Sequence, residues 1–316
     1  MQSLQKITAK TALLEELTSN LMAKLFQPHN FAQDKPTRLA LRLPRGAGAR
    51  HTVSQAQISR AVMPTNIQWT DAEDSHNKVT REFRIQRADS RDITGALWLP
   101  QSSVEGKTLI CCGHGASGDR YQAPISHLAE RFVDAGFPVL SLDGPVHGLR
   151  KVGDGGRKAF FPEYQRDNSL VDMTNEWAFA VEQIKAATGA GNLAYFGLSM
   201  GSLFGIPFIA SRTDVTVAAI GLMGVQPDFP HGETLLENAA QIKCPILFLM
   251  QLEDELFNRQ GGLDVFDAFA SKDKRLHANP GLHPEVPAEE IDFTFEFMLA
   301  HINGTQTKKI VNIISN

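Results

Sequence analysis

The feature that most constrains this fold is a regular alternation of short apolar segments with longer amphipathic ones, beginning near residue 79. The apolar segments are 107–112, 137–143, 192–197, 215–224 and 244–250. Short, almost wholly apolar runs are typical of strands buried on both faces of a parallel sheet. The segments 124–136 and 168–189 have helical spacing between them. This order predicts an α/β fold with right-handed crossovers.

A hairpin is expected to precede these units. Residues 79–87 (VTREFRIQR) alternate in polarity, and a polar turn joins them to 93–100 (ITGALWLP). We place the boundary of the α/β domain here, with residues 79–316 forming the domain and 1–78 an N-terminal extension. Within the extension, the apolar residues of 4–25 recur at helical spacing and predict one amphipathic helix.

Composition excludes several classes of protein. The 31 Lys and Arg are balanced by 35 Asp and Glu, for a net charge of −4, so no basic face for nucleic acid is expected. Lys6, Lys10, Glu15 and Glu16 interrupt the first segment, so a signal peptide is not indicated. No apolar run reaches the length of a membrane span. These observations predict a cytoplasmic protein without a membrane partner; the oligomeric state does not follow.

The three cysteines, Cys111, Cys112 and Cys244, have neither CxxC spacing nor an even count. A disulfide framework or a cysteine-ligated zinc site is therefore not expected, and burial within strands is the simpler interpretation. No HExxH motif and no phosphate-binding loop occurs either, so we expect no metal and no cofactor.

The strongest chemical motif is Gly-Leu-Ser-Met-Gly at 197–201, directly between an expected strand and an expected helix. A serine on such a sharp turn projects its Oγ beyond the sheet, and small neighbours avoid clashes at the strained backbone. The helix that follows favours negative charge at its N-terminus. The motif predicts that Ser199 is a nucleophile.

A serine nucleophile needs a base, and the base needs a group that orients it. Asp254 follows the strand 244–250, and His283 lies in a Gly/Pro loop before the last helix, which gives the chain order serine, acid, histidine. Glu253 and Glu255 are alternatives to Asp254, which we prefer because it lies at the middle of the turn. His277 is an alternative to His283 but falls within an expected strand.

Acyl transfer also needs donors for the oxyanion. The backbone N–H of Met200, directly after the nucleophile, is one candidate. The second is the N–H of Ala116 in the glycine-rich loop 113–118, GHGASG. His114 in the same loop precedes the serine, so a structural role is expected for it.

Together, DITGALWLP, LICCGHGASGD, LSLDGPVHG, FGLSMGS, LFLMQLEDEL and GLHPEVP resemble the α/β-hydrolase superfamily from residue 79 to the C-terminus. The hairpin and the GLSMGS turn are similar to its dienelactone-hydrolase and prolyl-oligopeptidase branch. The resemblance implies a mostly parallel eight-stranded sheet, a triad of Ser199, Asp254 and His283, and oxyanion donors at Ala116 and Met200. Serine replaces the nucleophilic cysteine of dienelactone hydrolases, and 78 preceding residues are too few for the β-propeller of the prolyl peptidases. A serine esterase acting on a small-molecule ester is therefore expected.

Other functions stay open. The same triad could serve a thioesterase or a C–C or amide hydrolase. The loop 113–118 also fits GxGxxG, with Asp143 at the end of the next strand, as in an NAD-dependent oxidoreductase. Against this, Pro124 places the helix start too far beyond Gly118 to hold a pyrophosphate. A non-catalytic binding protein on the same fold is the third alternative.

The segment 149–167 is longer than an ordinary connection, and we expect a loop there. Its aromatic residues, Phe160, Phe161 and Tyr164, either line a substrate pocket or pack onto the core.

Overall fold

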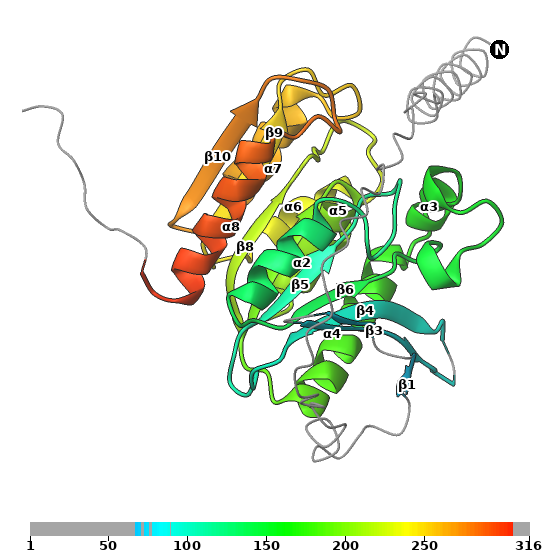
Figure 1. Cartoon of the computed structure of the whole chain (residues 1–316). Helices are drawn as coiled ribbons and strands as arrows, with labels where there is room; N and C mark the ends of the chain where they lie inside the picture. The colour runs from blue at the N-terminus through cyan, green and yellow to red at the C-terminus, as the bar shows by residue number, and fades with distance from the viewer. Residues whose placement is uncertain (1–66, 71–72, 76–77, 89, 306–316) are drawn as a thin grey trace, which may run out of the picture. The chain divides into compact units, whose positions relative to one another are not determined.

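The computed structural model describes residues 67–70, 73–75, 78–88 and 90–305. These residues form one sheet of ten strands covered by helices (Figure 1). The strands are β1 (Ile67–Trp69), β2 (Glu73–Ser75), β3 (Lys78–Ile85), β4 (Ile93–Pro100), β5 (Leu109–Gly113), β6 (Val139–Leu142), β7 (Leu193–Leu198), β8 (Val215–Gly221), β9 (Ile246–Gln251) and β10 (Lys274–Asn279).

The sheet is antiparallel at one end and parallel over the rest. Its strand order is β1-β3-β4-β6-β5-β7-β8-β9-β10, with β2 pairing β3 beside β1. β3 and β4 form the expected hairpin, and β4 pairs antiparallel with β6. Every pairing from β6 to β10 is parallel. The carboxyl ends of these parallel strands therefore meet at one edge, where ligands bind in α/β sheets.

Helices cover both faces of the sheet (Figure 1). They are α2 (Ile125–Asp134), α3 (Gly156–Tyr164), α4 (Ser169–Thr188), α5 (Met200–Ala210), α6 (Gly232–Ala239), α7 (Arg259–Ala268) and α8 (Ala288–Ile302), with a 3-10 turn at Gly148–Arg150. α2 and α8 pack on one face of the sheet. α4, α5, α6 and α7 pack on the other face, together with the aromatic residues of α3.

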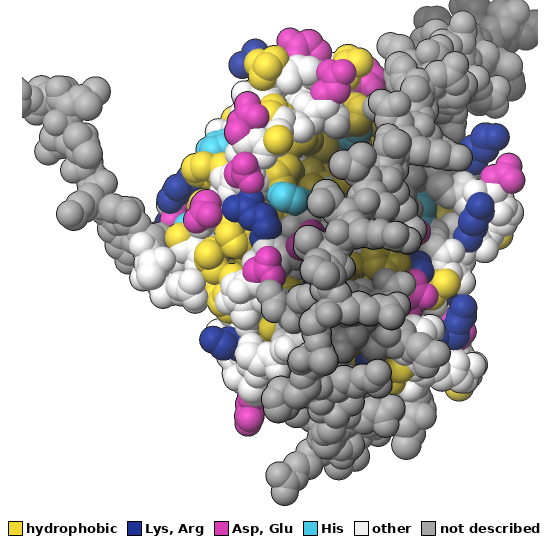
Figure 2. All heavy atoms as spheres, in the orientation of Figure 1, with side chains coloured by type: hydrophobic (Ala, Val, Ile, Leu, Met, Phe, Trp, Pro, Cys, Tyr) yellow, Lys and Arg dark blue, Asp and Glu magenta, His cyan; other side chains and the backbone are white. Residues whose placement is uncertain are grey.

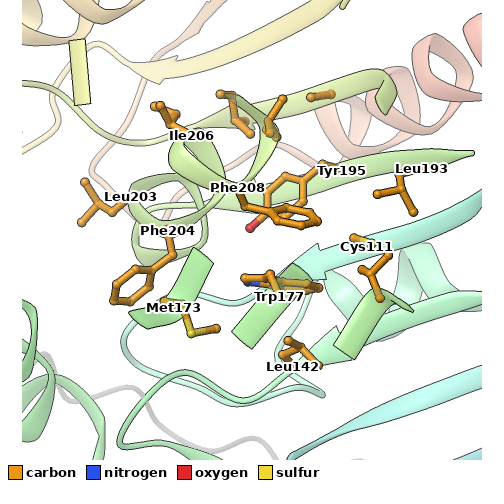
Figure 3. Packing of buried hydrophobic residues seen from close by; sticks show 14 of the residues in the cluster. Cys111, Leu142, Met173, Trp177, Leu193, Tyr195, Leu203, Phe204, Ile206 and Phe208 are labelled. Carbon is orange, nitrogen blue, oxygen red and sulfur yellow. The ribbon is translucent and has the colours of Figure 1, made fainter. Parts of the chain in front are cut away.

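Strand periodicity divides the apolar side chains between two cores. Successive residues of a strand point to opposite faces, so Cys111 belongs to the α4 and α5 side and Cys112 to the α2 and α8 side. Both thiols are free and buried, as expected, and Cys244 is free and partly buried. Figure 3 shows the first core, in which Trp177 of α4 stacks on Phe208 of α5 at 5.4 Å between ring centroids.

The α/β fold is confirmed, but the strand count of eight is wrong for the described residues. The eight strands read from the sequence correspond to β3–β10, and β1 and β2 are additional. Each of these is three residues long, too short for an alternating pattern to show. Because both precede residue 79, the sheet starts inside the stretch assigned to the N-terminal extension. The amphipathic helix expected over 4–25 lies outside the described residues.

The segment 149–167 also differs from the expected loop, because nine of its residues form α3. Phe160, Phe161 and Tyr164 all lie on this helix and are buried. Gly153, Gly155 and Gly156 favoured a loop, but α3 begins at the last of them, and the burial of the aromatic side chains stabilises the helix. Among the described residues, no helix is long and apolar enough to span a bilayer.

Candidate active site

Ser199 lies at the turn between β7 and α5 and has a strained backbone. Its φ is +56° with ψ −119°, a conformation that residues with a Cβ rarely adopt. Hydrogen bonds on both sides of the residue stabilise this conformation. Ser199 N–H donates to Gly221 O of β8 (2.9 Å), and Ser199 O accepts from the first turn of α5. Such a turn directs the serine side chain away from the sheet edge.

The flanking glycines are required by close backbone contacts. A Cβ on Gly197 would lie 2.8 Å from Gly201 O, and a Cβ on Gly201 would collide with the carbonyl of Gly113 on β5. Ser202, which the sequence did not single out, pins the same turn. Its Oγ lies 2.7 Å from both Gly197 O and Gly221 O, and it also accepts from Gly221 N–H (2.8 Å).

The structure brings Ser199, His283 and Asp254 into one hydrogen-bonded relay. Ser199 Oγ–H donates to His283 Nε2 (3.0 Å), and His283 Nδ1–H donates to Asp254 Oδ2 (2.8 Å). We assign the proton to Nδ1 because a carboxylate only accepts. The other oxygen, Asp254 Oδ1, accepts from the N–H groups of Leu256 (2.8 Å) and Phe257 (3.0 Å). With His283 only 5% exposed, the relay is shielded from water.

The rejected candidates have other partners. Glu255 Oε2 accepts from the backbone N–H of His283 (2.8 Å), and Glu253 accepts from that of Gly281. Both glutamates therefore bind the backbone of the histidine loop and leave the imidazole to Asp254. His277 lies on β10, where its Nδ1 is 2.9 Å from Glu290.

The two candidate oxyanion donors follow the neighbouring parallel strands β5 and β7. Met200 begins α5, and the first N–H groups of a helix have no partner within it. Ala116 lies in the loop after β5, and among the described residues its N–H has no recorded acceptor. His114, whose ring is buried, holds this loop: its Nδ1–H donates to Gly115 O (2.8 Å), and its Nε2 accepts from Gly144 N–H (2.7 Å). Burial lowers the pKa of His114 to about 3, so its imidazole is neutral.

A chain of aromatic side chains connects the relay to α3. The half-buried Phe257 packs beside the imidazole of His283, with ring centroids 5.8 Å apart. Phe229 contacts Phe257 at 5.6 Å, and Tyr164 of α3 contacts Phe229 at 6.0 Å. Phe229 and Phe257 fall in short connections without periodicity, so no pattern in the sequence indicates them.

The glycine-rich loop does not have the geometry of a dinucleotide site. α2 begins at Ile125, seven positions after Gly118, so its N-terminus does not open directly from the glycines as pyrophosphate binding requires. The acid that a dinucleotide site would need to bind ribose, Asp143, is fully buried, so its carboxylate is not accessible to a ligand in solvent. Among the described residues, no three His, Cys, Asp or Glu side chains are grouped to hold a metal ion. On the face drawn in Figure 2, basic side chains are interspersed with acidic ones.

Comparison with known proteins places this fold among esterases. The sequence matches no protein-family model and no curated protein. The structure is similar to a cold-adapted esterase from an Arctic intertidal metagenomic library, with 30% sequence identity and a TM-score of 0.64, covering 74% of this chain and 99% of that one. It shares its fold with an acetyl xylan esterase from Paenibacillus sp. R4, at 14% identity and a TM-score of 0.58, over 78% and 91% of the two chains. An esterase of Pyrococcus furiosus, at 14% identity and a TM-score of 0.53, is covered over 100% of its length by 83% of this chain. The nucleophile turn, the strand order and the 30% identity over a whole esterase together show that the chain belongs to the α/β-hydrolase superfamily.

Proposed function

We propose that this protein is a serine esterase, which hydrolyses carboxylic esters through an acyl-enzyme on Ser199. The observation that carries the proposal is the relay from Ser199 Oγ through His283 to Asp254, at 3.0 and 2.8 Å. A nucleophile within hydrogen-bond reach of a base, itself oriented by a third group, is the arrangement that activates a serine. The similarity to proteins named as esterases supports ester chemistry.

In the proposed reaction His283 acts first as base and then as acid. Its Nε2 takes the Ser199 proton while Oγ attacks the ester carbonyl, which gives a tetrahedral oxyanion. The imidazolium, stabilised by Asp254, gives that proton to the leaving alkoxide, and the C–O bond breaks. Water then attacks the acyl-enzyme by the same route, releasing the carboxylic acid and restoring Ser199.

The oxyanion is assigned to the N–H groups of Met200 and Ala116. Met200 offers its N–H at the start of α5, where the helix favours negative charge. A donor already in place when charge develops is among the largest single contributions to such catalysis.

The alternatives make different predictions. A thioesterase or an amide or C–C hydrolase would use the same residues on another bond. A non-catalytic binding protein would keep the relay without turnover. An NAD-dependent enzyme would need a pyrophosphate cradle that α2 does not provide.

The test is a panel of p-nitrophenyl esters of increasing acyl length, assayed beside a thioester and an aminoacyl anilide. We expect ester turnover by the wild type that survives dialysis against EDTA. Ser199→Ala should lose about 10⁴- to 10⁶-fold in kcat. A fluorophosphonate probe should label the wild type only. Ser211→Ala is the matched control, since Ser211 lies at the far end of α5 and should leave labelling and turnover unchanged.

Labelling that persists in Ser199→Ala would assign the nucleophile to another residue. Faster turnover of the thioester or anilide than of every ester would refute the ester assignment and retain the triad. Loss of activity in EDTA with recovery in zinc would refute the serine mechanism.

A further inference from the structure

The segment after β6, Asp143 to His147, is fixed in place by a buried carboxylate. Asp143 accepts from Thr94 Oγ1 (2.6 Å), Leu149 N–H (3.0 Å) and Arg120 Nη1 (3.1 Å). Burial by itself would raise the pKa of Asp143, but the Thr94 hydrogen bond and the Arg120 charge outweigh burial and lower it. The carboxylate is therefore charged, and it ties the end of β6 to Thr94, Arg120 and Leu149. We call the segment 143–147, which is held at Asp143 and again just beyond it at Leu149, the platform.

His147 lies on this platform and binds the oxyanion loop. It is 1% exposed, and its Nε2 lies 3.0 Å from Ala116 O. A carbonyl only accepts, so Nε2 carries the proton and donates. Burial lowers the pKa of His147, which keeps the ring neutral. Its Nδ1 is buried with no partner among the described residues, so within this part of the chain the side chain makes a single hydrogen bond, to Ala116 O.

Holding that carbonyl anchors Ala116 on its C-terminal side. The peptide before Ala116 is held at Gly115 O by His114 Nδ1 (2.8 Å) and Gly118 N–H (3.2 Å). The peptide after it is held at Ala116 O by His147. Because each peptide is planar, the bonds to Gly115 O set the direction of the Ala116 N–H, and the bond to Ala116 O fixes the next peptide. Ala116 is thus held on both sides, and His147 supplies the second of these anchors.

The same platform contacts the other candidate donor. A Cβ on Gly144 would lie 2.6 Å from Met200 Cε and 2.8 Å from His147 Nδ1, so Gly144 packs between the two residues. Phe160 of α3 also contacts His147, with ring centroids 6.3 Å apart. The position of His147 is thus determined by the platform on one side and α3 on the other.

We infer that His147 is a positioning residue of the oxyanion hole, which holds Ala116 so that its N–H points to the developing oxyanion. The inference rests on the proposed ester hydrolysis and adds a residue that does not touch the substrate. His147 acts through Ala116, so its loss should reduce stabilisation of the transition state more than binding of the ester.

Two amides that differ in reach test this role. Gln places its amide nitrogen near the position of His Nε2, whereas Asn is one methylene shorter and cannot reach Ala116 O. His147→Asn should lower kcat by about 10- to 100-fold with KM changed less than threefold, a smaller loss than removal of a whole oxyanion donor. A boronic acid that forms a tetrahedral adduct with Ser199 should bind His147→Asn more weakly by a similar factor. His147→Gln should recover kcat to within about threefold of wild type.

His301→Leu is the control for general loss of stability. His301 is also a buried histidine, bonded to Phe297 O and Asp273, but it lies at the end of α8. The variant His301→Leu should have a lower melting temperature, with kcat and boronate affinity unchanged.

Equal kcat in His147→Asn and wild type, with both folded, would overturn the inference. The inference would also be overturned if His147→Asn and His147→Gln lost the same factor in kcat and if that loss matched the decrease in their melting temperatures. A wild type that turns over no ester and takes no fluorophosphonate would overturn the proposed function as well. Ester turnover that is insensitive to His147 would overturn this inference alone.

Discussion

Replacing Asp254 by Asn tests the relay most directly, because the structure dictates which way the amide must face. Asp254 Oδ1 accepts from two backbone N–H groups, those of Leu256 and Phe257, at 2.8 and 3.0 Å. Only the amide oxygen of Asn can replace that acceptor, so the NH₂ group must point to His283 Nδ1. Nδ1 must then accept, and the imidazole proton moves to Nε2, which faces Ser199 Oγ.

A histidine protonated at Nε2 cannot take the serine proton. The expected loss is about 10⁴-fold in kcat, equivalent to about 5 kcal/mol of transition-state stabilisation. KM should change little, because the tautomer matters only once the proton must move. The melting temperature should stay within a few degrees of wild type, since both backbone hydrogen bonds to Oδ1 survive.

Glu255→Gln is the matched control for this variant. Glu255 accepts from the backbone N–H of His283, and the Gln oxygen can do the same, so kcat should stay within about threefold of wild type. Steady-state kinetics on the best ester of the panel and the rate of fluorophosphonate labelling measure both variants. If Asp254→Asn turned over within tenfold of wild type while Glu255→Gln lost activity, the assignment of the acid would be refuted.

Three further outcomes are expected. Phe160→Ala should lower the free energy of unfolding by about 3 kcal/mol in denaturant titration, because the ring is buried against His147, Tyr164 and Phe204. A stable variant with altered acyl-length preference would instead show that Phe160 lines the substrate pocket. The free energy of unfolding should fall by about 2 kcal/mol between pH 6.5 and 5 because of His114. The pKa of His114 is lower in the folded state than in the unfolded state, so stability that is present above about pH 6.5 is lost as the pH falls. Thermal melts should show a weaker dependence on pH for His114→Gln. His277→Ala should keep kcat within about threefold of wild type, since the His277 side chain bonds to Glu290. A loss of kcat equal to that of His283→Ala would show that His277, and not His283, is the base.

The parts of the site that the sequence predicted are those determined locally. The Gly-Leu-Ser-Met-Gly turn carries its own geometry, because the glycines and the strained Ser199 belong to one five-residue stretch. The crossover order then places Asp254 and His283 at the same sheet edge, since each follows a parallel strand. The strands β1 and β2 were missed because three residues are too few to show an alternating pattern. The helix α3 was missed because it depends on core residues that are distant in the chain.

The role of His147 could not be predicted from the sequence either. Its role depends on β5 and β6 lying side by side, which brings Ala116 within 3.0 Å of a histidine 31 positions later. The sequence places His147 in a motif but does not say which carbonyl it meets.

The acidic run at 253–255 shows how far a sequence argument reaches and where it stops. The middle residue was preferred because a short carboxylate at the centre of the turn meets the imidazole, and Asp254 does lie 2.8 Å from His283 Nδ1. A loop carboxylate in general is solvated, yet both neighbours bind the backbone of the histidine loop, Glu253 at Gly281 and Glu255 at His283 itself. Three consecutive acids therefore hold the histidine loop: Asp254 binds the imidazole of His283, and the two glutamates bind the backbone at Gly281 and His283. The backbone contacts explain why the loop can present His283 without a helix or strand beneath it. They also predict that the double variant Glu253→Gln/Glu255→Ala should mobilise the loop and reduce kcat more than Glu255→Gln, a difference that hydrogen exchange at residues 281–285 would locate.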